Sequence, residues 1–402
     1  MVKAHSLLYA VYVCLIVSII CGALLYYSNL YNMLNQFYNS REELYLQNQS
    51  ALNYALSNGN IEDGLTDPGT GITTGFELKT HGLLNLIVVK SCLKNDTITS
   101  AHIIGHHTAW ETALFVTNLS NSLSYSGNVK LIGSKMLPNL FIEEKNISSL
   151  PNTLISSGTI KLSGTKLPEI NPDFQKVFEN NVQQKVGLND LEKNSDAVYF
   201  NSFLNKTTQV QLSSPTLQDI SIKGNFVLYE KDSIVVSENN VLEDVILKAP
   251  IIRIKKGFKG SIQAFAQEKI VVEDNVTLSY PSVLSIYNSE SKSEIIINEN
   301  SKIYGGVVLF GTSFFKIEEN KIIVKAKSLI TGDVYCTGSL MLNGSVYGSV
   351  YTNKFFNRTA TGAYEDCIVN AEIDITKKPD YFISIPLFKT KDESYGVFKK
   401  VL

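Results

Sequence analysis

Arginine is scarce in this chain of 402 residues, and its near absence excludes one class of partner. Only Arg41, Arg253 and Arg358 occur. Arginine is the residue that most often reads phosphate groups and base edges through paired hydrogen bonds. The formal net charge of −2 also offers no general attraction to a polyanion. We therefore expect no nucleic-acid partner.

Cysteine is also sparse, with five residues in the whole chain. Cys14 and Cys21 lie in an apolar amino-terminal segment, which leaves Cys92, Cys336 and Cys367. Three cysteines do not make a disulfide-dense scaffold. A Cys336–Cys367 disulfide and two free buried thiols are both compatible with the sequence.

Charge is absent from Ser6 to Tyr27, and the next charged residue is Arg41. About 20 apolar residues are needed for a helix to cross a bilayer, because lipid satisfies no backbone amide. A cleaved signal peptide is the alternative, but this run is long and has no clear Ala-x-Ala cleavage site. The sequence thus predicts an uncleaved transmembrane helix over residues 6–27, with membrane lipid as its partner.

The positive charge nearest to this segment lies on its amino-terminal side. Lys3 and the amino terminus precede it, and nothing basic follows for about a dozen residues. This bias favours a cytoplasmic amino terminus and extracytoplasmic domains. We expect a single-pass protein of a bacterial inner membrane.

The residue pattern of the rest of the chain changes several times. Apolar residues at spacings of three and four, such as Leu30, Leu34 and Phe37, predict that the helix continues past the membrane. Glycines and a proline follow it, and then short apolar runs typical of strands. The predicted segments are a short cytoplasmic leader (1–5), the transmembrane helix (6–27), an extended helix (28–57), a flexible linker (58–75), a small β domain (76–145), a loop-rich connection (146–215), a parallel β-helix (216–370) and a carboxy-terminal segment (371–402).

An internal repeat supports the predicted β-helix. Residues 295–305 align without gaps with residues 322–332, an offset of about 27 residues, and a weaker copy begins at Ile270. In each copy apolar residues alternate in pairs on either side of a Gly or Asn turn. Stacked coils bury a column of aliphatic residues that no single copy can bury alone. The predicted fold class is mainly β, a right-handed parallel β-helix (solenoid) joined to a small β domain and a transmembrane helix.

One histidine cluster is a weak candidate for a metal site. His102, His106 and His107 are followed by Glu111. Three imidazoles and a carboxylate can hold zinc, but this spacing matches no standard zinc signature. Gly105 and the surrounding strand-like sequence argue against a helix that would align the first two. We expect a structural or surface role for these histidines, and no metal or cofactor.

Common catalytic motifs are missing. There is no Gly-x-Ser-x-Gly, no His-Glu-x-x-His and no glycine-rich phosphate loop. We expect no enzyme and nominate no catalytic residue. The alternative is a carbohydrate-active β-helix enzyme or a sugar-binding module, which would use paired carboxylates on one face. Available carboxylates are Glu273, Asp274, Glu290, Glu294 and Glu299, and no basic residue recurs beside them in the sequence.

Two parts of the chain resemble known families. The block from Lys321 to Asn353, with Gly-x-Val-Tyr and Gly-Ser-Leu-Met-Leu steps, resembles bactofilins, which are polymer-forming bacterial β-helices of the cytoplasm or the inner face of the membrane. The amino end, with its step from Gln47 to Leu56, resembles type IV pilins and minor pseudopilins. It lacks their leader-peptidase site and the glutamate near the start of the apolar run.

These features lead to one expected function and two alternatives. We expect an envelope protein with a structural, assembly or adhesion role, pseudopilin-like in layout, that binds protein partners or further copies of itself. Polysaccharide is a possible partner in the carbohydrate-active alternative. The bactofilin resemblance implies the other alternative, a polymer scaffold on the inner face of the membrane.

Overall fold

The computed structural model describes residues 4–58, 64–106, 112–119, 122–147, 151–179, 185–193, 198–288, 292–311, 319–358, 362–388 and 395–401. Its contacts divide the chain into two units. The first unit holds residues 1–55, 60–77 and 89–100. The second unit holds residues 56–59, 78–88 and 101–402.

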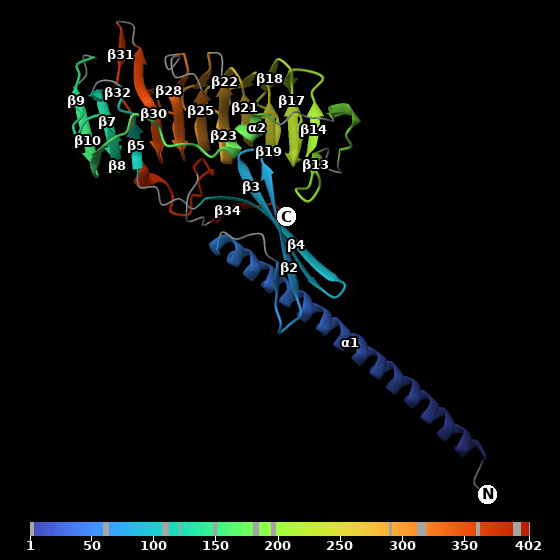
Figure 1. Ribbon diagram of the computed structural model, residues 1–402. Coiled ribbons are helices and arrows are strands. Elements are labelled where there is room, and N and C mark those ends of the chain that lie inside the picture. Colours follow the sequence, from blue (N-terminus) through green and yellow to red (C-terminus); the bar gives the residue numbers. More distant parts are fainter. Residues whose placement is uncertain are drawn as a thin grey trace. The chain divides into compact units, whose positions relative to one another are not determined.

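A single helix, α1 (Ala4–Asn58), opens the chain and is 55 residues long. It joins the predicted membrane segment and the predicted extended helix without a break. By length and composition it is the one helix among the described residues that can cross a membrane. Figure 1 shows it as one continuous element.

An antiparallel sheet follows the helix, and its strands β2, β3 and β4 have residues in both units. Residues 65–74, which the sequence assigned to a flexible linker, form a hairpin in which Leu65 pairs with Thr74. Asp67 stabilises its turn by accepting a hydrogen bond from the amide of Gly69 at 3.0 Å. In order across the sheet, the strands are β1 (Leu65–Thr66), β2 (Thr73–His81), β3 (Leu84–Leu93), β4 (Asp96–His106) and β34 (Tyr395–Lys400).

Within the first unit, a buried amide joins α1 to the sheet. The Asn48 side chain donates to the carbonyl of Val89 and to Ser91 Oγ, both at 3.2 Å. Ser100 Oγ donates to Asn48 Oδ1 at 2.7 Å, and Thr74 Oγ1 lies 2.8 Å from Ser91 Oγ. Leaving a buried polar side chain without hydrogen bonds costs stability, so this network fixes where α1 contacts the strands.

A second, 26-stranded sheet makes up most of the second unit (Figure 1). Among the described residues its ladders are parallel except for the antiparallel pair β30–β31. A three-stranded sheet of β32 (Cys367–Val369), β6 (Ser124–Ser126) and β9 (Glu143–Glu144) lies apart from it in pairing. The strands of the large sheet are β5 (Thr112–Val116), β7 (Asn128–Ile132), β8 (Ser134–Leu137), β10 (Thr153–Ser157), β11 (Ile160–Leu162), β12 (Val186–Gly187), β13 (Tyr199–Asn201), β14 (Thr208–Gln211), β15 (Thr216–Leu217), β16 (Ser221–Gly224), β17 (Phe226–Tyr229), β18 (Ser233–Val236), β19 (Val241–Lys248), β20 (Ile251–Ile254), β21 (Lys259–Ala266), β22 (Lys269–Val272), β23 (Thr277–Asn288), β24 (Glu294–Ile297), β25 (Lys302–Gly311), β26 (Lys321–Val324), β27 (Leu329–Thr331), β28 (Val334–Leu342), β29 (Ser345–Tyr347), β30 (Val350–Arg358), β31 (Ala363–Glu365) and β33 (Glu372–Asp374).

The strand register confirms the repeat read from the sequence. Ile270 of β22 pairs with Ile295 of β24, and Ile295 pairs with Ile322 of β26. The next strand of each copy follows the same rule, since Ile303 pairs with Ile330. Alternate residues of these strands are fully buried in one apolar cluster, as the period of two requires.

A glycine stands at one corner of successive copies. Gly332 has φ +129°, and a Cβ there would lie 1.8 Å from the carbonyl oxygen of Gly305. Gly348 repeats the arrangement on Gly332. Only glycine allows the backbones of successive copies of the repeat to approach this closely. This explains why Gly305 and Gly332 recur at the repeat offset.

The large sheet also takes in residues that the sequence assigned elsewhere. Leu114 of β5 pairs with Val350 of β30, and β10 pairs with β7. The strands β5, β7, β8, β10 and β11, which lie in the segments that we expected to be the small β domain and the loop-rich connection, therefore extend the parallel stack beyond β30 and β33. A short apolar strand such as β5 carries no repeat signature, so the sequence gives no sign of its partner.

An outer apolar layer covers part of the large sheet within the second unit. Phe265, Val308 and Tyr351 point out of the sheet and pack against residues of α2 (Asp173–Glu179), among them Phe174, and of the segment 385–388. This short helix lies in the segment that the sequence assigned to a loop-rich connection (146–215). The cysteines Cys336 and Cys367 are buried and free.

Candidate functional site

The structure separates the histidines that the sequence grouped. His102 and His106 lie on β4, which confirms that this segment is a strand and not a helix. Four residues of strand span about 13 Å, too far for both imidazoles to bind one zinc ion at about 2 Å. Among the described residues no group of three His, Cys, Asp or Glu side chains can hold a metal. His107 and Glu111 lie outside the described residues.

His102 is buried without a hydrogen-bond partner on either ring nitrogen. Burial, with a smaller contribution from the positive charge of Lys400, lowers the pKa of His102 from 6.5 to about 4. The ring is therefore neutral at pH 7. It is a core side chain that becomes protonated only at acidic pH.

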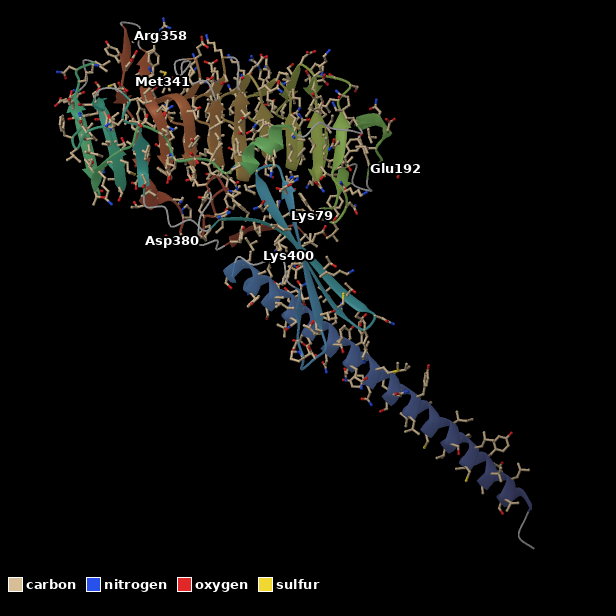
Figure 2. All side chains as sticks on the ribbon, in the orientation of Figure 1. Lys79, Glu192, Met341, Arg358, Asp380 and Lys400 are labelled. Atoms are coloured by element: carbon tan, nitrogen blue, oxygen red, sulfur yellow. The ribbon has the colours of Figure 1, made fainter. Side chains whose placement is uncertain are left out.

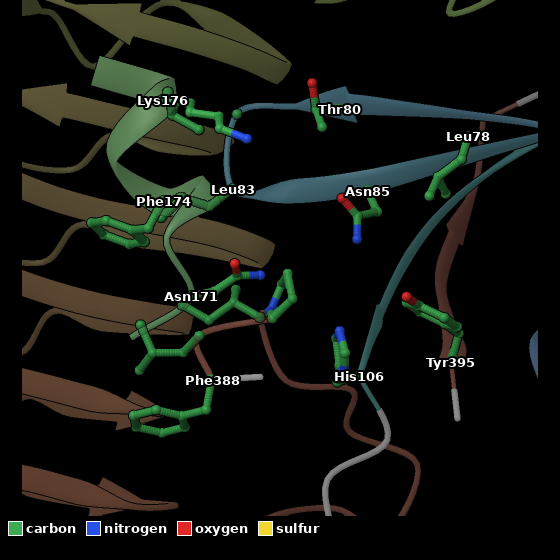
Figure 3. Close-up of a pocket in the computed structure, with 15 residues that line it drawn as sticks. Leu78, Thr80, Leu83, Asn85, His106, Asn171, Phe174, Lys176, Phe388 and Tyr395 are labelled. Carbon is green, nitrogen blue, oxygen red and sulfur yellow. The ribbon is translucent and has the colours of Figure 1, made fainter. Parts of the chain in front are cut away.

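His106 lines a pocket of the second unit with a volume of about 550 Å³ (Figure 3). Its ring packs against Tyr395 with centroids 4.9 Å apart. Asn85 of β3 and Asn171 bring amide groups to the pocket, and Lys176 brings a positive charge. The remaining lining residues are Leu78, Thr80, Gly82, Leu83, Phe174, Val177, Ile385, Pro386, Leu387, Phe388 and Tyr395.

The chemistry of this pocket suits binding and not acid–base hydrolysis. A volume of this size falls within the range of small-molecule sites. No carboxylate occurs among the described lining residues, so the paired acids of a glycosidase are missing there. Aromatic rings and amides can instead stack on and hydrogen-bond a polar ligand.

The turn that forms one wall of the pocket is held by Gln263 of β21. Its side-chain Nε2 donates to the carbonyl of His81 at 2.8 Å, and its Oε1 accepts from the amide of Leu83 at 2.9 Å. Gly82 between them has φ +63°, and a Cβ there would collide with the Gln263 side chain. The turn and the large sheet are thus connected by a buried amide that the sequence analysis missed.

Asp244 is a second polar centre beside this turn. Its backbone carbonyl lies 2.9 Å from His81 Nε2, and its carboxylate accepts from Ser261 Oγ at 2.9 Å and Lys399 Nζ at 2.8 Å. Burial opposes the charge of Lys399, but its bonds to Asp244 and Glu243 prevail and raise the Lys399 pKa. The group connects β2, β21 and β34, and we assign it a structural role.

Two of the carboxylates considered for carbohydrate chemistry, Glu273 and Glu294, are paired with lysines. Glu294 contacts Lys269 at 2.8 Å and Lys321 at 2.9 Å, and Glu273 contacts Lys255 at 3.1 Å. Burial raises the pKa of Glu294, but these lysines lower it by more, so the net shift is downward. These basic partners, Lys255, Lys269 and Lys321, are 18, 25 and 27 residues away along the chain, and the sequence gives no sign that they meet the carboxylates. Glu290 lies outside the described residues.

The two ends of the large sheet are its clearest accessible feature. At one end β10 and β11 pair only with β7 and β8 among the described residues, and Ile155 and Leu162 are 55% and 58% exposed. At the other end the described pairings of β12 and β13 are with β14 and β16 alone, and Phe200 is 57% exposed. Strand edges of this kind present unpaired backbone groups that can accept another chain.

Comparison with protein-family models, with curated proteins and with solved structures finds no match to this chain.

Proposed function

We propose that this chain is a single-pass envelope protein of a bacterial inner membrane, with its amino terminus in the cytoplasm, that acts as a self-assembling scaffold. The long apolar helix supports the anchor, and Lys3 on its amino-terminal side supports the orientation. The ends of the large sheet support assembly. The bactofilin-like scaffold on the inner face is the alternative topology.

The finer part of the proposal is that the large sheet closes into a right-handed parallel β-helix. Val334–Cys336 at the start of β28 pair with β25, whereas Ser339–Leu342 at its end pair with β26, so this strand turns a corner. In the same way β19 pairs with both β16 and β17. The inward residues of all these strands belong to one buried cluster, as a closed coil requires.

The observation that carries the function is the pair of open ends. The strands within the stacks run parallel, so the β10–β11 end of one copy can receive the β12–β13 end of another in the same sense. Such a contact joins different surfaces and does not close on itself, so it generates a linear assembly. Ile155, Leu162 and Phe200 are the exposed apolar side chains that would be buried at the joint.

Two end variants test this contact in the full chain purified in detergent. Ile155→Lys and Phe200→Lys each place a charge at one end and leave the other intact. We expect each variant alone to stop lengthwise growth in negatively stained electron micrographs. A mixture of the two should yield particles two units long, because one intact joint remains. Val241→Lys is the matched control, since Val241 is 48% exposed on β19, away from both ends.

Other results would contradict the proposal. Wild-type particles that do not lengthen with concentration would exclude end-to-end assembly. Lengthening that survives both variants would place the contact elsewhere. Pairing of the Phe200→Lys variant with itself would indicate a symmetric contact between like ends.

A second candidate function is sugar binding in the pocket beside His106. The observation that favours it is the combination of aromatic rings with the amides of Asn85 and Asn171 in one cavity of about 550 Å³. Titration calorimetry with neutral hexose and N-acetylhexosamine disaccharides should detect binding that Asn85→Ala weakens and Lys231→Ala does not. Absence of heat with every sugar would remove this candidate.

A further inference from the structure

Tyrosines recur along one side of α1 just beyond the predicted membrane segment. Tyr31, Tyr38 and Tyr45 are seven residues apart and are 55%, 61% and 48% exposed, and Leu34 between them is 48% exposed. At about 100° per residue these four side chains fall within a sector of about 60°. We call these four residues the tyrosine stripe. Figure 2 shows the side chains of this part of α1 projecting outward.

Over its own length, the tyrosine stripe is distinct from the buried face of α1. The buried positions Leu44, Asn48 and Ala51 centre about 100° away from the stripe around the helix axis, and the buried Leu52 and Leu56 return to its direction only beyond its last residue. The opposite side of residues 29–40 is polar, with Asn29, Asn32, Gln36, Asn39 and Ser40. One side of this helical segment is therefore aromatic while the far side suits water.

Two charges flank the stripe in a self-complementary way. Arg41 and Glu42 lie about 50° to either side of its centre, at nearly the same height along the helix. In a symmetric pair of parallel helices, one flank of each helix faces the opposite flank of its partner. Each Arg41 would then face Glu42 of the partner helix, whereas an antiparallel pair would lose this match.

We propose that the tyrosine stripe is the contact surface for the α1 helix of a second copy of this chain, in a parallel pair. The repeat of seven residues is the spacing that keeps a helical seam facing its partner. Anchoring of both copies in one membrane in the same orientation makes the parallel arrangement available without a change in either domain. The pair buries Tyr31, Leu34 and Tyr38 beside the membrane and is separate from the end contacts of the large sheet.

Disulfide crosslinking of the full chain in vesicles of its native membrane tests the pair. The background carries Cys14→Ser, Cys21→Ser and Cys92→Ser, and Leu34→Cys reports on the stripe. Asn32→Cys, at a similar depth on the polar side, is the control for random collisions. We expect oxidation to crosslink Leu34→Cys at least about five-fold more than Asn32→Cys.

A charge exchange makes the test specific. Arg41→Glu should reduce the Leu34→Cys crosslink, and adding Glu42→Arg should restore it. Neighbouring residues on one helix do not face each other, so the second substitution can compensate for the first only through contacts with a partner helix. The crosslink should persist when Ile155→Lys is added, which separates this pair from the end-to-end assembly. Equal crosslinking at Leu34 and Asn32, or no rescue by the exchange, would overturn the proposal.

Discussion

The large parallel sheet and the helix–sheet contact of the first unit are stabilised in different ways. In the sheet each copy of the repeat places similar residues on the next, as Ile270, Ile295 and Ile322 do. In the first unit one amide, Asn48, connects α1 with two strands, and no second copy of that contact occurs among the described residues. Repeated packing of similar residues thus stabilises the large sheet, whereas one polar network connects α1 with the strands of the first unit.

The largest effect should come from the glycine corner of the repeat. Gly332→Ala would place a methyl group 1.8 Å from the Gly305 carbonyl at a φ of +129°, so adjacent strands must separate. We expect a loss of about 4 kcal/mol or more in the free energy of unfolding. Chemical denaturation of the full chain measures it. Gly75→Ala, where nothing lies within 4 Å, is the control, and equal stability of the two variants would refute the stacked corner.

The next largest loss of stability should depend on the alternation of buried and outward-facing residues along one strand. Ile322 of β26 is fully buried in the core, whereas its neighbour Ile323 points the other way and is half-buried. Ile322→Ala should cost about 3 kcal/mol by leaving a cavity, and Ile323→Ala less than half as much. The same denaturation experiment compares them. A larger loss at Ile323 would mean that the strand register is wrong.

Acid should weaken the fold through buried histidine. The folded-state pKa of His102 is lowered to about 4, so between pH 6.5 and pH 4 the unfolded chain binds more protons than the folded one. Stability is therefore complete above pH 6.5 and falls as the pH drops, by at most about 3 kcal/mol. Thermal unfolding at several pH values should show this slope, and His102→Leu should reduce it. Burial lowers the His81 pKa too, so some slope will remain. An unchanged slope would contradict the assignment to His102.

The smallest effect sharpens the contrast with the first unit. Asn48→Ala removes the partner of Ser100 and Ser91, so we expect a loss of about 2 kcal/mol from unsatisfied buried groups. Hydrogen exchange should show faster exchange in residues 89–100 and no change in β22–β26. The exposed neighbour Ser50→Ala should leave both regions unchanged. Faster exchange throughout the large sheet would show that the two regions are not independent.

The sequence predicts what repeats and misses what does not. The stack from β20 to β29 could be predicted because similar side chains recur at a fixed sequence offset. The position of β5 beside β30 was not, since a strand of five residues has no signature for a partner more than 200 residues away. The Gln263 contact likewise joins residues that are about 180 positions apart. The pocket combines residues from four separate parts of the chain, 78–85, 106, 171–177 and 385–395. The grouping of His102 with His106 in the sequence does not bring their side chains together, because β4 is extended and separates them.

The location of the large sheet tests the account most directly, because an envelope scaffold must work outside the cytoplasm. Protease accessibility of a carboxy-terminal tag should be measured in intact cells, in spheroplasts and after lysis. The account predicts cleavage before lysis, at the latest in spheroplasts. Protection until lysis would contradict it and would place the large sheet on the cytoplasmic side.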